Sequence, residues 1–116
     1  MKTIVTSYGS FLTGTEIADA VTGYGLVLAR AHSVDVVDIP FLADDGSVGR
    51  VALRVGWLSD MAAVSTDGLQ DELVEVDTIM TLLSKISWLE DRRGLAFADD
   101  DIEHLRTSDV NWDDII

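Results

Sequence analysis

The chain has no cysteine and a single proline among its 116 residues. Without cysteine, disulfide bonds, zinc–thiolate sites and a cysteine nucleophile are all excluded. Histidine is scarce as well, with only His32 and His104, and no serine lies in a Gly-x-Ser-x-Gly pattern. The sequence therefore predicts no catalytic residue, no metal site and no cofactor, and it favours a protein that is not an enzyme.

Positive charge is also in short supply. Two Lys and six Arg stand against 16 Asp and five Glu, which gives a formal net charge of −13. Such an anionic surface repels a phosphate backbone, so direct nucleic-acid binding is not expected. It suits a basic protein partner, or an acidic mimic of nucleic acid that inhibits a DNA-binding protein. A salt-adapted source, whose proteins are acidic throughout, would explain the same charge without any specific partner.

Long hydrophobic runs are missing too. No stretch reaches 18 apolar residues, and the first nine residues lack the apolar core of a signal peptide. We therefore expect a soluble, cytoplasmic protein that does not enter a membrane. The 47% of hydrophobic residues is enough for one core. The expectation is a single globular domain over residues 1–116, in which 107–116 form a flexible or docking tail.

The hydrophobic pattern predicts several short strands. They are expected at residues 3–7, 34–41, 50–57 and 61–65, and the second and third of them should form a hairpin. The apolar residues change phase between Val36 and Val37, which predicts a bulge in that strand. Pro40 is compatible with a position near the edge of the sheet.

Helical periodicity appears in three places. Ile17, Val21, Tyr24 and Leu28 form one apolar stripe of a first helix, capped by Thr13 or Thr15. A second helix should begin at Asp77 and end in residues 91–94, and a short third one should cover 98–106. The predicted fold is therefore α+β: a small antiparallel sheet of three to four strands, two main helices on one face, and a short C-terminal helix with an acidic tail.

The segment from Tyr8 to Thr15 is expected to be the loop between the first strand and the first helix. Its glycines are five residues apart, as in a phosphate-binding loop, but Thr15 replaces the lysine of such a loop. The segment is either an ordinary capped turn or a site for a small anionic ligand. The candidate ligand-binding residues are Ser10, Thr13, Gly14 and Thr15, together with Arg50 and Arg54 as cationic groups.

The two arginines share one face of the third strand, because residues two apart in a strand point the same way. Arg30 and His32 follow the first helix and are candidates to join them. Such a patch would attract either an external acid or the protein's own tail. The plainer interpretation is that these are solvated arginines that discourage pairing at a sheet edge.

The last residues alternate bulky apolar groups with acids. Trp112, Asp113, Asp114 and Ile115 are candidate partner-binding residues, because an aromatic anchor with a charged rim is typical of protein interfaces. The same segment could equally fold back on its own core. Asp99 to His104 also concentrates acids beside a histidine, but the spacing of a calcium loop is missing and helix capping explains the acids.

Together these patterns favour a non-enzymatic protein–protein interaction module or a self-associating one. The expected partner is a basic protein or a second copy of the chain, most simply in a homodimer. The alternative is a small protein or enzyme that binds an anionic ligand through the loop from Tyr8 to Thr15.

Overall fold

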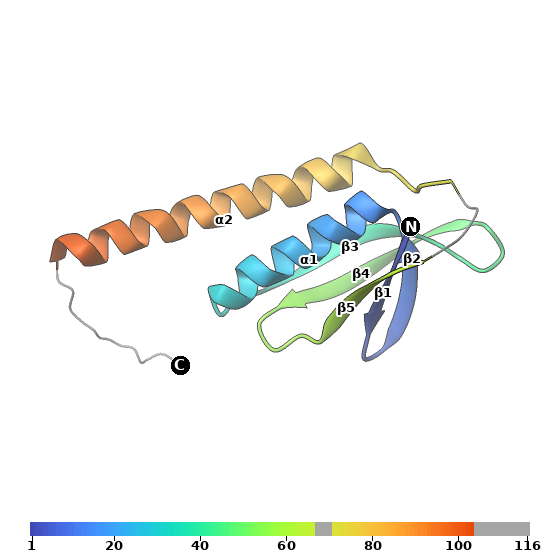
Figure 1. Ribbon diagram of the computed structural model, residues 1–116, viewed down its shortest axis with the longest axis horizontal. Helices are drawn as coiled ribbons and strands as arrows, with labels where there is room; N and C mark the ends of the chain where they lie inside the picture. The colour runs from blue at the N-terminus through green and yellow to red at the C-terminus, as the bar shows by residue number, and fades with distance from the viewer. Residues whose placement is uncertain (67–70, 104–116) are drawn as a thin grey trace.

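The computed structural model describes residues 1–66 and 71–103, with side chains described as far as Arg92. Over these residues the chain forms five strands and two helices, so the predicted α+β class is confirmed. In chain order the elements are β1 (Lys2–Thr6), β2 (Gly9–Thr13), α1 (Thr15–Arg30), β3 (Val34–Leu42), β4 (Val48–Gly56), β5 (Met61–Ser65) and α2 (Val76–Glu103). They stack in layers, with α1 between the sheet and α2 (Figure 1).

The sheet is antiparallel throughout and has the order β4-β3-β2-β1-β5. This confirms an antiparallel sheet but corrects its size, because five strands replace the expected three or four. The additional strand is β2, which occupies most of the segment predicted as a loop. Phe11 on β2 lies opposite Ile4 on β1 and packs against the core. Burial of one face of this short strand outweighs the turn preference of Gly9, its first residue, and of Gly14, which follows it.

The sheet has a weak joint between β2 and β3. The register of these strands contains a single pair, Leu12 with Leu42. Next to it the buried Thr13 hydroxyl donates a hydrogen bond of 2.8 Å to the carbonyl of Pro40. Proline has no N–H to donate, so Pro40 fits a strand at the point where its ladder to the neighbour has ended.

The predicted hairpin of β3 and β4 is confirmed, and its ladder runs without interruption from Val34 opposite Gly56 to Leu42 opposite Val48. There is therefore no bulge in this ladder, contrary to the prediction. Val37 points into the core with 4% of its surface exposed, whereas Val36 points outward with 59% exposed. The change of phase arises because both faces of β3 carry valine, not because the backbone is irregular.

Helix α1 is buried on most of its circumference. The predicted apolar stripe is confirmed, and further side chains are buried because α2 covers the helix from the other side. The buried residues are Ile17, Ala18, Ala20, Val21, Tyr24, Val27 and Leu28. Gly14 occupies the N-cap position and supplies no side-chain cap, so neither Thr13 nor Thr15 has the predicted capping role.

Helix α2 is one continuous helix from Val76 to Glu103. The predicted end at residues 91–94 and the separate helix at 98–106 are therefore wrong. Gly94 lies within the helix, because a glycine costs only about 1 kcal/mol there and does not end a helix by itself. Neither helix in the described part of the chain is long and apolar enough to cross a membrane. The predicted docking tail, 107–116, lies outside the described residues.

Candidate functional site

The candidate ligand-binding residues do not converge on one place. Ser10 lines a hollow of about 690 Å³ beside Asp44, with no lysine or arginine in its lining. Thr13 is fully buried and bonded to the backbone of β3. Arg50 and Arg54 do share the outer face of β4, as predicted, but they line two different hollows. The described residues therefore do not assemble the predicted set into a pocket for one small anion.

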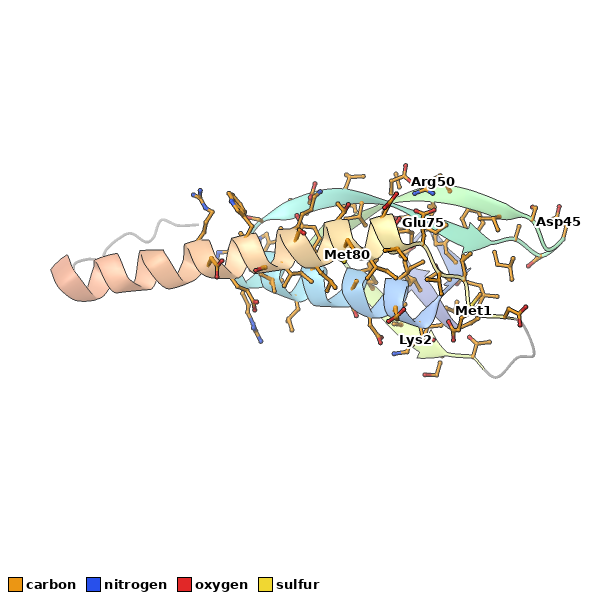
Figure 2. All side chains as sticks on the ribbon, turned by 90° about the horizontal axis from the view of Figure 1, so that it is seen from above. Met1, Lys2, Asp45, Arg50, Glu75 and Met80 are labelled. Carbon is orange, nitrogen blue, oxygen red and sulfur yellow. The ribbon has the colours of Figure 1, made fainter. Side chains whose placement is uncertain are left out.

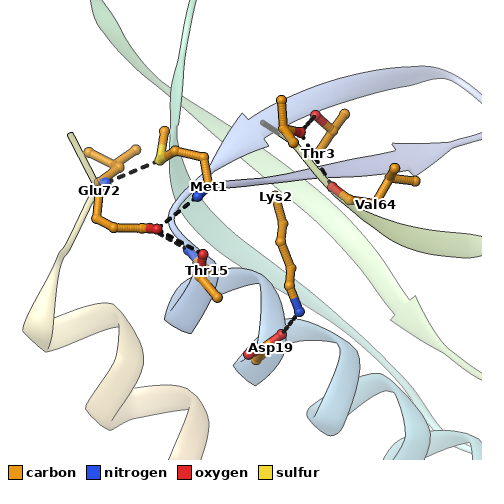
Figure 3. A network of polar contacts seen from close by, with 9 residues as sticks. Met1, Lys2, Thr3, Thr15, Asp19, Val64 and Glu72 are labelled. Carbon is orange, nitrogen blue, oxygen red and sulfur yellow. Dashed lines mark hydrogen bonds and ion pairs between the residues drawn. The ribbon is translucent and has the colours of Figure 1, made fainter. Parts of the chain in front are cut away.

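Gly14 and Thr15 lie at the N-terminus of α1, and a carboxylate of the chain itself occupies this position. Glu72 accepts hydrogen bonds of 2.9 Å from both the backbone N–H and the hydroxyl of Thr15. It also forms an ion pair of 2.8 Å with the amino group of Met1 (Figure 3). The unpaired N–H groups and the dipole at a helix start attract an anion, and Glu72 supplies it. Gly14 permits this approach, because a Cβ there would lie 1.7 Å from the carbonyl oxygen of Leu73.

These contacts stabilise the ionised form of Glu72. The hydrogen bond from the amino group of Met1, followed by those from Thr15, lowers the pKa of Glu72 from its ordinary 4.5 to about 2. A carboxyl group whose pKa falls on folding stabilises the native state above its unfolded pKa, and it loses that effect as the pH drops toward the folded value.

The substitution Glu72→Gln should therefore lower the free energy of unfolding by an amount that depends on pH. The difference from the unchanged chain should be constant near neutral pH and should close between about pH 4.5 and pH 2. Urea unfolding at a series of pH values measures it. Glu16→Gln is the matched control. It removes one carboxylate from the first turn of α1, and Glu16 forms no ion pair among the described side chains. A Glu72→Gln difference that stays the same down to pH 2 would contradict the assignment.

Arg50 anchors the start of α2 to the hairpin of β3 and β4. Its guanidinium donates to both carboxylate oxygens of Glu75, at 2.9 and 3.1 Å, and to Asp38 on β3 at 2.7 Å. Figure 2 shows Arg50 and Glu75 side by side at this edge of the molecule. The hydrogen bonds from Arg50 lower the pKa of Glu75, and the hydroxyl of Thr78 donates to the same carboxylate. Arg50 is therefore engaged within the fold.

A second polar cluster connects α2 with α1 and β3. The Tyr24 hydroxyl donates a hydrogen bond of 2.6 Å to Asp35, and the Lys85 ammonium lies 3.2 Å from the same carboxylate. Burial, with the hydrogen bond to Asp35 in the same direction, raises the pKa of Tyr24 to about 12. The Tyr24 hydrogen bond lowers the pKa of Asp35. Both clusters contact α2 or its start, and its apolar side chains pack against the core, so the orientation of its remaining faces is defined.

One of these faces is apolar and exposed. Val76, Met80 and Leu83 follow one another at intervals of four and three residues, which places them on one side of the helix. Their exposed fractions are 64%, 57% and 48%, whereas Leu82 on the opposite side is 3% exposed. We call Val76, Met80 and Leu83 the α2 ridge; Met80 is labelled in Figure 2.

Sequence patterning did not identify the α2 ridge. The stretch from Ile79 to Leu83 is apolar on nearly all sides, which predicts burial on more than one side. The structure buries the side that faces α1, where Ile79, Leu82 and Ile86 join the core. It leaves the α2 ridge uncovered by any described residue. Only the position of α1 determines which side of this stretch is buried and which is exposed.

The α2 ridge has acidic ends. Asp77 adjoins Val76, and Glu90 lies seven residues after Leu83, two turns further along the same face. Asp91 is exposed beside Glu90. The described cations of α2 are engaged elsewhere, since Lys85 pairs with Asp35 and Arg92 stacks on Trp88 at 4.7 Å. The helix therefore presents an apolar strip with a negative rim.

The described residues contain no group of three or more side chains arranged to hold a metal ion. The candidate partner-binding residues Trp112, Asp113, Asp114 and Ile115 lie outside the described residues, as does His104. Comparison with protein-family models, with curated proteins and with solved structures found no match, so function has to be inferred from the chain's own residues.

Proposed function

We propose that this protein is a non-enzymatic interaction module whose α2 ridge binds a basic, amphipathic helix of another protein. The observation that carries the proposal is the exposed apolar strip of Val76, Met80 and Leu83 with acidic residues at both ends. An amphipathic helix with apolar residues at intervals of three and four can pack along such a strip. Covering three half-exposed side chains would contribute about 1 kcal/mol each.

Charge determines the choice of partner. The chain carries a net charge of −13, and four of its cationic groups are already used in ion pairs with its own acids. A second copy docked on the α2 ridge would bring Asp77, Glu90 and Asp91 toward the same acids of its partner, and like charges across an interface are unfavourable. Lysine and arginine beside the apolar face of a partner helix would pair with them instead. The basic partner is therefore favoured over a homodimer at this surface.

The test uses a designed peptide of about 18 residues that forms an amphipathic helix with leucine on one face and lysine on the other. Binding to the full chain is followed by fluorescence anisotropy. We expect the double substitution Met80→Ala with Leu83→Ala to weaken binding at least tenfold, which corresponds to about 1.4 kcal/mol. Circular dichroism should show an unchanged fold, because both side chains are exposed.

The controls separate the α2 ridge from general charge attraction. Val5→Ala with Val64→Ala removes two exposed apolar side chains from the sheet and should leave binding unchanged. A peptide of the same composition, scrambled so that its leucines share no face, should bind much more weakly. Equal binding of both peptides would overturn the proposal. A dimer of the free chain that dissociates on substitution of Met80 and Leu83 would assign the α2 ridge to a second copy and would overturn it as well.

A further inference from the structure

A second exposed surface lies at the other side of the molecule, around the connection from β4 to β5. Trp57 stacks on His32 with ring centres 4.2 Å apart, and the backbone N–H of Trp57 donates to the carbonyl of Ser33 at 2.9 Å. Leu58 follows with 81% of its side chain in solvent. A large apolar residue this exposed, beside an indole ring, is typical of a contact surface.

The backbone at this surface is strained. His32 has φ of 53° and Leu58 has φ of 61°, and both lie in the left-handed region that side chains disfavour by about 1–2 kcal/mol. The stacked ring and the backbone bond between Trp57 and Ser33 hold the two segments together. Strain kept at an exposed position where it presents an apolar side chain points to a role in binding.

Hollows lie on both sides of the connection. One of about 190 Å³ is lined by Tyr8, Arg54 and Leu58 together with Asp60. The other, of about 230 Å³, lies between α1 and the connection, and most of the residues that line it together with Met61 are small. Both are smaller than the roughly 300–1,000 Å³ of sites for drug-sized ligands. Their size suits single side chains of a bound segment.

Two arginines border this surface, Arg30 at the end of α1 and Arg54 on the outer face of β4. Arg30 and Arg54 form no ion pair with any acid in the part of the chain whose side chains are described, whereas Lys2, Arg50 and Lys85 all do. We call Arg30, His32, Arg54, Trp57 and Leu58 the cationic corner. Asp60 is the one acid in the lining of the hollow beside Arg54. The chemistry that fits the cationic corner is an acidic segment with large apolar side chains.

We propose that the cationic corner binds the chain's own residues 107–116. This segment has the required composition, since Trp112 and Ile115 flank the carboxylates of Asp113 and Asp114. Carboxylates would pair with the guanidinium groups of the cationic corner, and the indole would enter a hollow beside Leu58. The site is separate from the α2 ridge and does not depend on its function.

The length of the chain allows this docking. Helices α1 and α2 run side by side in the same direction, and α2 continues beyond the end of α1 (Figure 1). Gly23 of α1 lies beside Ile86 of α2, so the end of α1 at Arg30 is level with residue 93. The ten residues to Glu103 extend about 15 Å further. The nine residues from Glu103 to Trp112 span up to about 30 Å, enough to return to the cationic corner.

The absence of cysteine permits a direct test by paramagnetic NMR. Ser108→Cys creates the only thiol of the chain, and a nitroxide attached to it broadens amide signals of nearby residues. We expect broadening at residues 30–33 and 54–60, in addition to residues next to the label. A label at Ser47→Cys, in the turn between β3 and β4, serves as the control and should leave residues 30–33 unaffected.

Two changes should reverse the broadening. Trp112→Ala removes the apolar anchor, and Arg54→Glu replaces an attractive charge with a repulsive one, so each should restore the signals by several-fold. Added salt should act in the same direction, because exposed ion pairs are screened. Broadening confined to residues beside the label would overturn the proposal. Broadening that appears only when labelled and unlabelled chains are mixed would assign the segment to a second copy and would overturn docking within one chain.

Discussion

Replacing Gly14 with alanine is expected to lower the free energy of unfolding by about 3 kcal/mol. The new Cβ would lie 1.7 Å from the carbonyl oxygen of Leu73 and 2.8 Å from its carbonyl carbon. Both are backbone atoms, so no side chain can rotate away and the backbone itself must move. Overpacking of this kind costs about 1–3 kcal/mol, and a contact between two backbones belongs at the upper end. Urea unfolding followed by circular dichroism measures the change.

Gly23→Ala provides the matched control for this substitution. Its Cβ would lie 3.6 Å from the Cδ1 atom of Ile86, which is an ordinary contact. Because Gly23 lies inside α1, alanine should stabilise the helix by about 0.5–1 kcal/mol. The same substitution should thus have opposite signs at two positions nine residues apart. Equal effects at Gly14 and Gly23 would show that the close approach at Leu73 does not exist in solution.

Leu82→Ala is expected to have a comparable or larger effect, a loss of about 2–5 kcal/mol in the free energy of unfolding. Leu82 is 3% exposed and belongs to the hydrophobic core, so truncation removes buried methyl groups and leaves a cavity between α1 and α2. Chemical unfolding of the purified variant gives the value. A loss below about 1 kcal/mol would mean that α2 does not pack on α1 as described.

Leu83, the residue next to Leu82, supplies the control for the effects on stability and on peptide binding. Leu83 is 48% exposed, so Leu83→Ala should change stability by no more than about 0.5 kcal/mol. It should nevertheless weaken binding of the basic amphipathic peptide, because Leu83 belongs to the α2 ridge. Leu82→Ala and Leu83→Ala therefore separate the face that holds the fold from the face proposed to bind a partner.

The elements that the sequence predicts well are those with a strong local pattern. The alternation of Val51, Leu53 and Val55 with Arg50 and Arg54 identifies β4 and its two faces, and the structure confirms both. The apolar stripe of α1 is confirmed for the same reason. Where the local pattern is short or conflicts with glycine, as in β2 or at Gly94, tertiary packing and helix continuity decide the outcome.

The contacts at the candidate sites could not be predicted because they are not local. Glu72 lies 57 residues from Thr15, and no spacing rule connects a carboxylate to a helix start at that distance. The contact of Arg50 could not be predicted for the same reason, because its pairing with Glu75 depends on where α2 begins. The sequence therefore predicted Arg50 and Thr15 as candidate residues, but not the three acids that bind them, Asp38, Glu72 and Glu75.

The single residue pair between β2 and β3 has a consequence for how the domain opens. Backbone bonds tie β1 to β2 and β5, and β3 to β4, but hardly tie these two groups of strands to each other. Helix α1 contacts β1 and β5 on one side of this joint and β3 and β4 on the other. We therefore expect α1, rather than the hydrogen-bond ladder, to couple the unfolding of the two strand groups. Slow amide exchange across the whole sheet would then require α1 to stay docked.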